Sequence, residues 1–254
     1  MINGEIRRVN YPLDNDITSL ESDGIISYVI TQLHGNILKS TLQIETEQWV
    51  HDCCITIKSK NTLKINIKNG QYPKIIAYVG IRKSLSLIEM SGTERIRTTN
   101  SINSQYLKLK MSGSSSGDIQ LNISSKLYIE MSGTAHLTLS GHVNDSAIIH
   151  LTGVNTFDGT RCSIEKVSLF VTGVGTAYIV GHSAVDIDVS SVGTVYYRGP
   201  IRKLHYTGVG SVKSMDNWSK YSYRSSANYK KQNYFIFVIF VIIQFIRSFF
   251  ILLK

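Results

Sequence analysis

Hydrophobic and polar residues alternate along most of this 254-residue chain, and each alternating run ends at a pair of small residues. Leu107–Met111, Leu127–Met131 and Val167–Val171 follow this pattern, and a shorter run such as Leu137–Leu139 comes after each pair. Alternation with a period of two is the pattern of half-buried β-strands. No helical period appears between the runs, so this part of the chain is predicted to be all-β.

The small-residue pairs recur at intervals of 21, 20, 20, 20, 18 and 17 residues, counted from the apolar residue before each pair. A fixed period of this length is typical of a repeat architecture, in which each repeat covers the apolar face of its neighbour. We interpret one repeat as strand, small-residue corner, strand, glycine corner and loop, which makes one coil of a β-solenoid. The predicted corner residues are Ser91, Gly92, Ser112, Gly113, Ser132, Gly133, Thr152, Gly153, Thr172, Gly173, Ser190, Ser191, Thr207 and Gly208.

Serine, threonine and glycine suit these corners for physical reasons. Glycine reaches backbone angles closed to other residues, and the hydroxyl groups can hydrogen-bond nearby backbone atoms. Equivalent residues of stacked coils lie about 4.7–4.9 Å apart, so a bulky corner side chain would clash with its copies above and below. We therefore interpret the corner residues as structural and assign none of them a catalytic or cofactor-binding role.

The stretch before the regular repeats, residues 15–90, also alternates but less evenly. Leu42–Ile44, Ile55–Ile57 and Leu63–Ile67 are predicted strands separated by polar turns. They are interpreted either as degenerate opening coils or as an antiparallel cap, with regular coils following over residues 91–215. Residues 1–14 form a polar, basic N-terminal segment without the apolar stretch of a signal peptide.

The end of the chain has a different composition. Residues 216–233 read as a polar linker, and Tyr234–Leu253 follows as an almost continuous apolar stretch. About 20 apolar residues in a helix span the roughly 30 Å hydrocarbon core of a bilayer. Gln244 and Arg247 interrupt the stretch, but a long arginine side chain can reach the interface. We therefore predict a C-terminal transmembrane α-helix, with the membrane as a partner; a buried core helix is the alternative.

A second kind of anchor fits the same region. Ser225, Ser226 and Ala227, a short polar spacer and the apolar tail resemble a signal for a glycosylphosphatidylinositol (GPI) anchor. That route requires entry into the secretory pathway. A signal peptide upstream of Met1 would place the solenoid at the cell surface, whereas without one the chain would be tail-anchored with its solenoid in the cytosol.

Composition narrows the function classes further. The chain has 27 Lys and Arg against 18 Asp and Glu, a formal net charge of +9, but the basic residues are scattered. With no nucleic-acid motif, they are interpreted as a solvated outer face, and attraction to an anionic membrane surface is the second interpretation. Three cysteines are too few for a disulfide framework, and on a strand Cys53 and Cys54 would point to opposite faces.

Histidines are the first candidates for a metal site. His142 and His182 each follow a glycine and lie two repeats apart, which predicts a separation of about 9–10 Å. Because zinc ligands lie about 2.0–2.1 Å from the ion, these two side chains cannot share one. His136 and His150 are predicted on strands without matching partners. No metal site is therefore assigned.

Carboxylates are the candidates for catalysis or calcium binding. Asp118, Asp158, Asp186 and Asp188 are isolated from one another in the repeat pattern, although the last two share an outward strand face. Calcium takes 6–8 oxygen ligands, more than this pair supplies. No catalytic residue is assigned.

The repeats resemble those of a known family. Stretches such as Leu107–Asp118, Leu127–Ala135 and Val185–Val195 are similar to the Leu-x-Leu-x-Leu-Ser-Gly-Ser-Gly-Asp repeats of the "putative auto-transporter adhesin, head GIN domain" family, over roughly residues 15–215. The resemblance implies a right-handed parallel β-helix, often surface-attached, without established enzymatic activity. Here most aspartates after the second glycine are missing and several second Gly or Ser residues are Val, which argues against a cation role for this position.

Together these patterns favour a non-enzymatic, membrane-anchored β-solenoid that displays a repetitive surface for binding a protein or glycan, or for assembly. Two alternatives stay open. A carbohydrate-active β-helix enzyme would need a groove with clustered acids and a basic residue. A structural oligomer would associate end to end through exposed coil edges.

Overall fold

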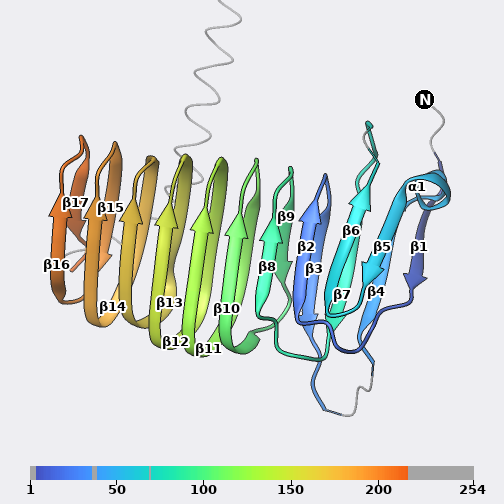
Figure 1. Cartoon of the computed structure of the whole chain (residues 1–254), viewed down its shortest axis with the longest axis horizontal. Helices are drawn as coiled ribbons and strands as arrows, with labels where there is room; N and C mark the ends of the chain where they lie inside the picture. The colour runs from blue at the N-terminus through green and yellow to red at the C-terminus, as the bar shows by residue number, and fades with distance from the viewer. Residues whose placement is uncertain (1–3, 36–38, 69, 217–254) are drawn as a thin grey trace, which may run out of the picture. The chain divides into compact units, whose positions relative to one another are not determined.

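The computed structural model describes residues 4–35, 39–68 and 70–216, and the chain divides into two units, residues 1–213 and 214–254. The first unit is an all-β solenoid of about six turns, as Figure 1 shows. It confirms the predicted β-solenoid; the right-handed winding implied by the family resemblance stays a prediction.

The regular coils pair in parallel, each with the next along the chain. Leu127 of one coil pairs with Ala147 of the next, and Ala147 pairs with Val167. This spacing confirms coils of about 20 residues. The strands of these coils and of the last two turns are β10 (Ile102–Met111), β11 (Ser116–Met131), β12 (Thr134–Leu151), β13 (Val154–Val171), β14 (Val174–Val189), β15 (Gly193–Arg198), β16 (Ile201–Tyr206) and β17 (Ser211–Ser214).

Inward-facing residues of successive coils stack into apolar columns. One such column runs through Leu109, Ile129, Ile149, Leu169 and Ile187, each of which is at most 1% exposed. Burying an Ile or Leu side chain contributes about 1.5–3 kcal/mol, so each coil depends on its neighbours for most of its stability.

The predicted loop is absent from the coils of β11 to β14, whereas a short break is present at residues 99–101, before β10, and at residues 199–200, after β15. β12 continues without interruption from Thr134 to Leu151, and the pairing register shifts between Thr138 and Ser140 and again between Val143 and Ser146. Gly141, with φ +111°, lies inside this strand. A β-bulge of this kind bends a strand while the hydrogen-bonded ladder continues on both sides, so the coil turns without leaving the sheet.

The N-terminal end of the solenoid is closed by antiparallel strands. β4 (Thr41–Glu47) pairs with both β1 (Ile6–Tyr11) and β7 (Ile76–Ile81), and β5 (Ile55–Ser59) pairs with β6 (Thr62–Ile67). The antiparallel cap predicted as one alternative for residues 15–90 is therefore present. Such pairing with short antiparallel strands protects the edge of a solenoid against association with other chains.

One coil lies out of chain order. β2 (Ser19–Asp23) pairs with β6 and with β8 (Leu87–Met90), and β3 (Ser27–Gln32) pairs with β7 and with β9 (Arg95–Thr98). In Figure 1 this blue coil accordingly lies between the cyan strands β6 and β7 and the green strands β8 and β9. The degenerate opening coils thus exist, but they do not stack in the order in which they follow one another in the chain.

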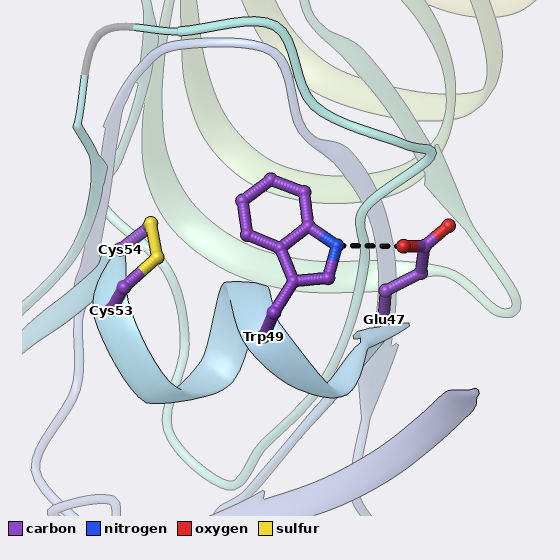
Figure 2. Close-up of a disulfide and its surroundings, with 4 residues drawn as sticks. All are labelled: Glu47, Trp49, Cys53 and Cys54. Atoms are coloured by element: carbon purple, nitrogen blue, oxygen red, sulfur yellow. Dashed lines mark hydrogen bonds between the residues drawn. A yellow bond between two sulfur atoms is a disulfide. The ribbon is translucent and has the colours of Figure 1, made fainter. Parts of the chain in front are cut away.

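Cys53 and Cys54 do not lie on a strand, so the opposite orientation considered for a strand does not apply. Cys53 ends the helix α1 (Gln48–Cys53), Cys54 follows as its C-cap, and a disulfide joins the two neighbours (Figure 2). The third cysteine, Cys162, is buried in the core, and desolvation raises the pKa of its thiol to about 12. This thiol is therefore protonated and unreactive at neutral pH.

The predicted anchor falls outside the described residues. Tyr234–Leu253, all of the linker except Asp216, and the GPI-type residues Ser225, Ser226 and Ala227 lie there. Within residues 4–35, 39–68 and 70–216, no helix has the length and hydrophobicity to cross a membrane.

Candidate binding surface

The corner glycines stack with their backbones in contact. A Cβ atom on Gly113, Gly133 or Gly153 would lie 2.5 Å from the carbonyl oxygen of the corner glycine one coil earlier. All three have φ between +69° and +87°, a left-handed conformation that disfavours other residues. The same close approach links Gly92 to Gly24. The stacked corner glycines therefore leave no room at their positions for side chains that could face a ligand.

The corner hydroxyl groups bind the coil before them. Ser112 Oγ donates to the Met90 carbonyl and Thr152 Oγ1 to the Met131 carbonyl, each at 3.2 Å. The backbone N–H groups of the corners also donate to the previous coil. Those that do so include Ser91, Ser112, Ser132, Thr152, Thr172, Ser190 and Thr207. These contacts between coils support the structural interpretation of the corners.

An exposed apolar column lies immediately after the corners. Val154, Val174, Val192 and Val209 are 56%, 52%, 53% and 78% exposed. Val154 pairs with Val174, and the pairing of the next residues, Gly175 with Gly193, places Val192 in line. Gly210 stacks closely on Gly193, which places Val209 in line as well. We call Val154, Val174, Val192 and Val209 the valine column. The sequence shows the valines as departures from the repeat pattern, but it does not show their alignment on the outer surface.

Aromatic side chains form columns on the outer faces. The His150 ring stacks on Phe170 with centroids 4.7 Å apart and contacts Tyr128 at 5.5 Å, while Tyr178 stacks on Tyr196 at 4.9 Å. His150 thus lies between two aromatic rings, contacts that the repeat pattern does not indicate. The stacked ring faces cover one another, so they do not form the flat open platform on which a sugar chain could lie.

His142 and His182 occupy one column. His142 pairs with Ser163 of the next coil, and Ser163 Oγ lies 2.7 Å from His182 Nε2. One coil therefore separates the two histidines, as the repeat spacing predicts. Within the described ranges, no three His, Cys, Asp or Glu side chains converge as a metal site would require.

The aspartates stay apart from one another, as the sequence predicts, but three of them have partners of other kinds. Asp118 forms an ion pair with Arg161 at 3.7 Å, and Asp186 forms a two-pronged pair with Arg202, whose Nε lies 2.9 Å from Oδ1. The hydrogen bond from Arg202 is the main cause of the lowered pKa of Asp186. Asp158 accepts hydrogen bonds from the amide and hydroxyl of Thr160. These partners lie within one to two coils of each acid, and the four carboxylates do not form a cluster.

One carboxyl group is buried where the out-of-order coil meets the regular ones. Glu94 is only 3% exposed; its Oε1 accepts a hydrogen bond from Ser22, whose hydroxyl also lies 2.6 Å from the Tyr28 hydroxyl. Glu94 Oε2 has no hydrogen-bond partner among the described residues. Desolvation is the main cause that raises the pKa of Glu94 to about 7, against the lowering effect of Ser22. No pattern in the sequence singles out this residue.

A small pocket opens between two corners at the N-terminal end. We call it the corner pocket; its volume is about 190 Å³. Tyr72 lines it, and the ring of Trp49 from α1 stacks on Tyr72 with centroids 5.7 Å apart. The sequence could not indicate this pocket, because its walls come from segments that only the out-of-order coil brings together. The lining residues are Asp23, Gly24, Ile25, Asn66, Ile67, Lys68, Gly70 and Tyr72.

Comparison with known proteins identifies relatives of this architecture. A family model described as "Putative auto-transporter adhesin, head GIN domain" matches residues 20–200. No curated protein matches the chain.

Several solved structures share the fold. A "putative adhesin" from Bacteroides fragilis is 22% identical, with a TM-score of 0.76 over 83% of this chain and 97% of that one. A "putative adhesin" from Parabacteroides merdae is 17% identical, with a TM-score of 0.63 over 84% and 97%. A "Putative lipid binding protein" from Parabacteroides distasonis is 14% identical, with a TM-score of 0.54 over 84% and 97%.

Proposed function

Because this chain belongs to the family described as "Putative auto-transporter adhesin, head GIN domain", we propose that it is a non-enzymatic, adhesin-like module whose repetitive outer surface binds a ligand. We further propose that Tyr234–Leu253 anchors the module in a membrane at the cell surface. The adhesin names of its structural relatives agree with this class of function.

The valine column is the observation that carries the proposal. All four of its side chains are more than half exposed, although valine favours buried sites. The fold does not require valine there, since Thr134 pairs with Val154 in the same column one coil earlier. An aligned row of exposed apolar side chains on a polar surface is typical of an interaction site.

The distribution of acids favours binding over catalysis. A glycosidase uses two carboxyl groups about 5–9.5 Å apart on either side of the substrate bond. Asp118 and Asp186 are each engaged by an arginine in separate coils, and Glu94 is shielded from solvent. The carbohydrate-active enzyme is therefore the weaker alternative.

The surface function can be tested with the full-length chain inserted into liposomes. We expect these liposomes to attach to at least one spot of a slide printed with polysaccharides and extracellular-matrix proteins. The triple variant Val154→Thr, Val174→Thr and Val192→Thr should reduce attachment at least tenfold, because threonine keeps the shape and strand preference of valine but is polar. Attachment is measured by counting labelled liposomes per spot.

The matched control is Ile148→Thr, which makes the same kind of change at an exposed residue outside the column, 37% exposed. It should attach like the unmodified chain. The proposed role of the column would be contradicted if the unmodified chain attached to no spot. It would also be contradicted if the triple variant attached as well as the unmodified chain.

The anchor has its own test. The full-length chain is expected to sediment with the membrane fraction of expressing cells and to leave it only with detergent, because about 20 apolar residues suffice to span a bilayer. A chain ending before Tyr234 should appear in the supernatant. A full-length chain that is soluble without detergent would rule out the anchor.

A further inference from the structure

We propose that the corner pocket binds a single sugar residue of a glycan. This inference rests on the proposed binding function and deepens it by naming the ligand class. The pocket lies between the corner joining β2 to β3 and the corner joining β6 to β7.

The polar side chains of the pocket match a neutral ligand with many hydroxyl groups. Asp23 offers acceptors, Lys68 offers donors, and the Asn66 amide offers both. Asp23 and Asn66 are register partners on neighbouring strands, so they face the same opening. In the part of the chain that the structure describes, none of these three side chains has a hydrogen-bond or ion-pair partner. The opposite charges of Asp23 and Lys68 balance, which favours a neutral sugar over an anion or a cation.

The size of the pocket limits the ligand. Pockets for drug-sized molecules have volumes of roughly 300–1,000 Å³. At about 190 Å³ the corner pocket is smaller, which suits one sugar ring with the rest of the glycan in solvent. Tyr72 adds an aromatic surface that can contact the apolar C–H groups of such a ring.

The helix α1 holds two walls of the pocket in place. Its Trp49 stacks on Tyr72 at an interplanar angle of 19°, and the Cys54 carbonyl accepts a hydrogen bond of 3.1 Å from the Lys68 amide. Figure 2 shows Trp49 Nε1 donating to Glu47 at one end of α1 and the disulfide of Cys54 at the other. These contacts order the pocket before the ligand arrives, which lowers the entropic cost of binding.

Because Trp49 stacks on a residue that lines the pocket, its fluorescence can report binding of a sugar. The chain has two tryptophans, Trp49 and Trp218, so the variant Trp218→Phe leaves Trp49 as the single indole emitter. Full-length protein carrying this change, in a detergent without a sugar headgroup, is titrated with galactose, mannose, fucose or N-acetylglucosamine. We expect a saturable change in Trp49 fluorescence with a millimolar Kd for at least one sugar, and saturation-transfer NMR signals from the same sugar.

Two pocket variants and one control define the site. Asp23→Asn and Asn66→Ala should each weaken binding at least tenfold at an unchanged melting temperature. Lys58→Ala, in a separate hollow lined by Tyr11, Pro12, Ile57 and Ser59, should bind like the parent. No saturable signal by either method up to about 100 mM sugar, well above the millimolar range of weak binding, or unchanged binding by both pocket variants, would overturn the assignment.

The outcomes separate this inference from the proposed function. Liposomes that attach through the valine column while no sugar binds would overturn the pocket assignment and leave the adhesin-like function standing. Sugar binding by a chain whose liposomes attach nowhere would support the pocket and overturn the role of the column.

Discussion

Replacing Gly133 with alanine is expected to lower the free energy of unfolding by more than about 3 kcal/mol, the sum of backbone strain and a clash between coils. The φ of +72° at Gly133 costs an L-residue about 1–2 kcal/mol. The new Cβ would also lie 2.5 Å from the Gly113 carbonyl oxygen and 2.8 Å from its amide nitrogen. Relief by movement is blocked because Gly153 stacks on Gly133 just as closely. The strain therefore reaches two interfaces between coils.

A second glycine separates the two contributions. Gly35 has a φ of +71°, but a Cβ atom at this position would meet no heavy atom within 4 Å among the described residues other than its chain neighbours, so Gly35→Ala carries mainly the backbone strain. Its expected cost is about 1–2 kcal/mol. Urea unfolding followed by circular dichroism measures both variants. Equal losses for Gly133→Ala and Gly35→Ala would show that stacking contributes nothing beyond backbone strain.

Stability is also expected to fall as the pH rises from about 4.5 to about 7, through the titration of Glu94. Its pKa is raised from 4.5 in the unfolded chain to about 7 in the folded one. The folded state therefore binds the proton more tightly, and the stabilisation is complete below pH 4.5 and lost as the pH passes about 7. A shift of this size corresponds to about 3 kcal/mol.

The environment of Glu94 explains the direction. Desolvation disfavours the carboxylate most, and the nearby Asp23 acts the same way; hydrogen bonds from Ser22 and from the amides of Gly92 and Ser91 oppose them. The Tyr28 hydroxyl, which contacts Ser22, has its own pKa raised by burial, so it stays neutral throughout this range.

Glu94→Gln isolates this contribution, because glutamine keeps the volume and an acceptor for Ser22 but cannot ionise. The variant should be close to the unmodified protein in stability near pH 4.5 and more stable at about pH 8, above the folded-state pKa. The measurement is the urea midpoint at half-unit pH steps. Parallel pH curves for the two proteins would exclude Glu94 as the cause.

The regular coils could be predicted because every repeat contains the two sequence signals that determine its structure. Alternation sets which side chains face inward, and the Ser/Thr-Gly pairs set where the chain turns, as at Gly113 and Gly133. Both signals act over a few residues and recur in every coil, so each coil places its strands and corners where the adjacent coil has its own. The parallel stacking and coil length therefore follow from the sequence alone.

The arrangement of side chains on the outer surface is harder to predict from the repeat pattern. The valines were visible as departures from the repeat, but their alignment depends on the exact coil register, which shortens from 20 to 18 and 17 residues toward the end. The stacking of His150 on Phe170 depends on the same register, because contact across strands requires side chains to lie side by side.

Local sequence patterns suffice to make this protein a β-solenoid with glycine corners, whereas the positions of its pocket and its buried acid follow from tertiary pairing alone. Both positions depend on the coil of β2 and β3, which inserts between strands far from it in the chain. Its corner glycine, Gly24, stacks under Gly92 like any other corner. Strand pairing depends on the complementarity of edges and not on chain order, so no local pattern could show which two coils this one would separate.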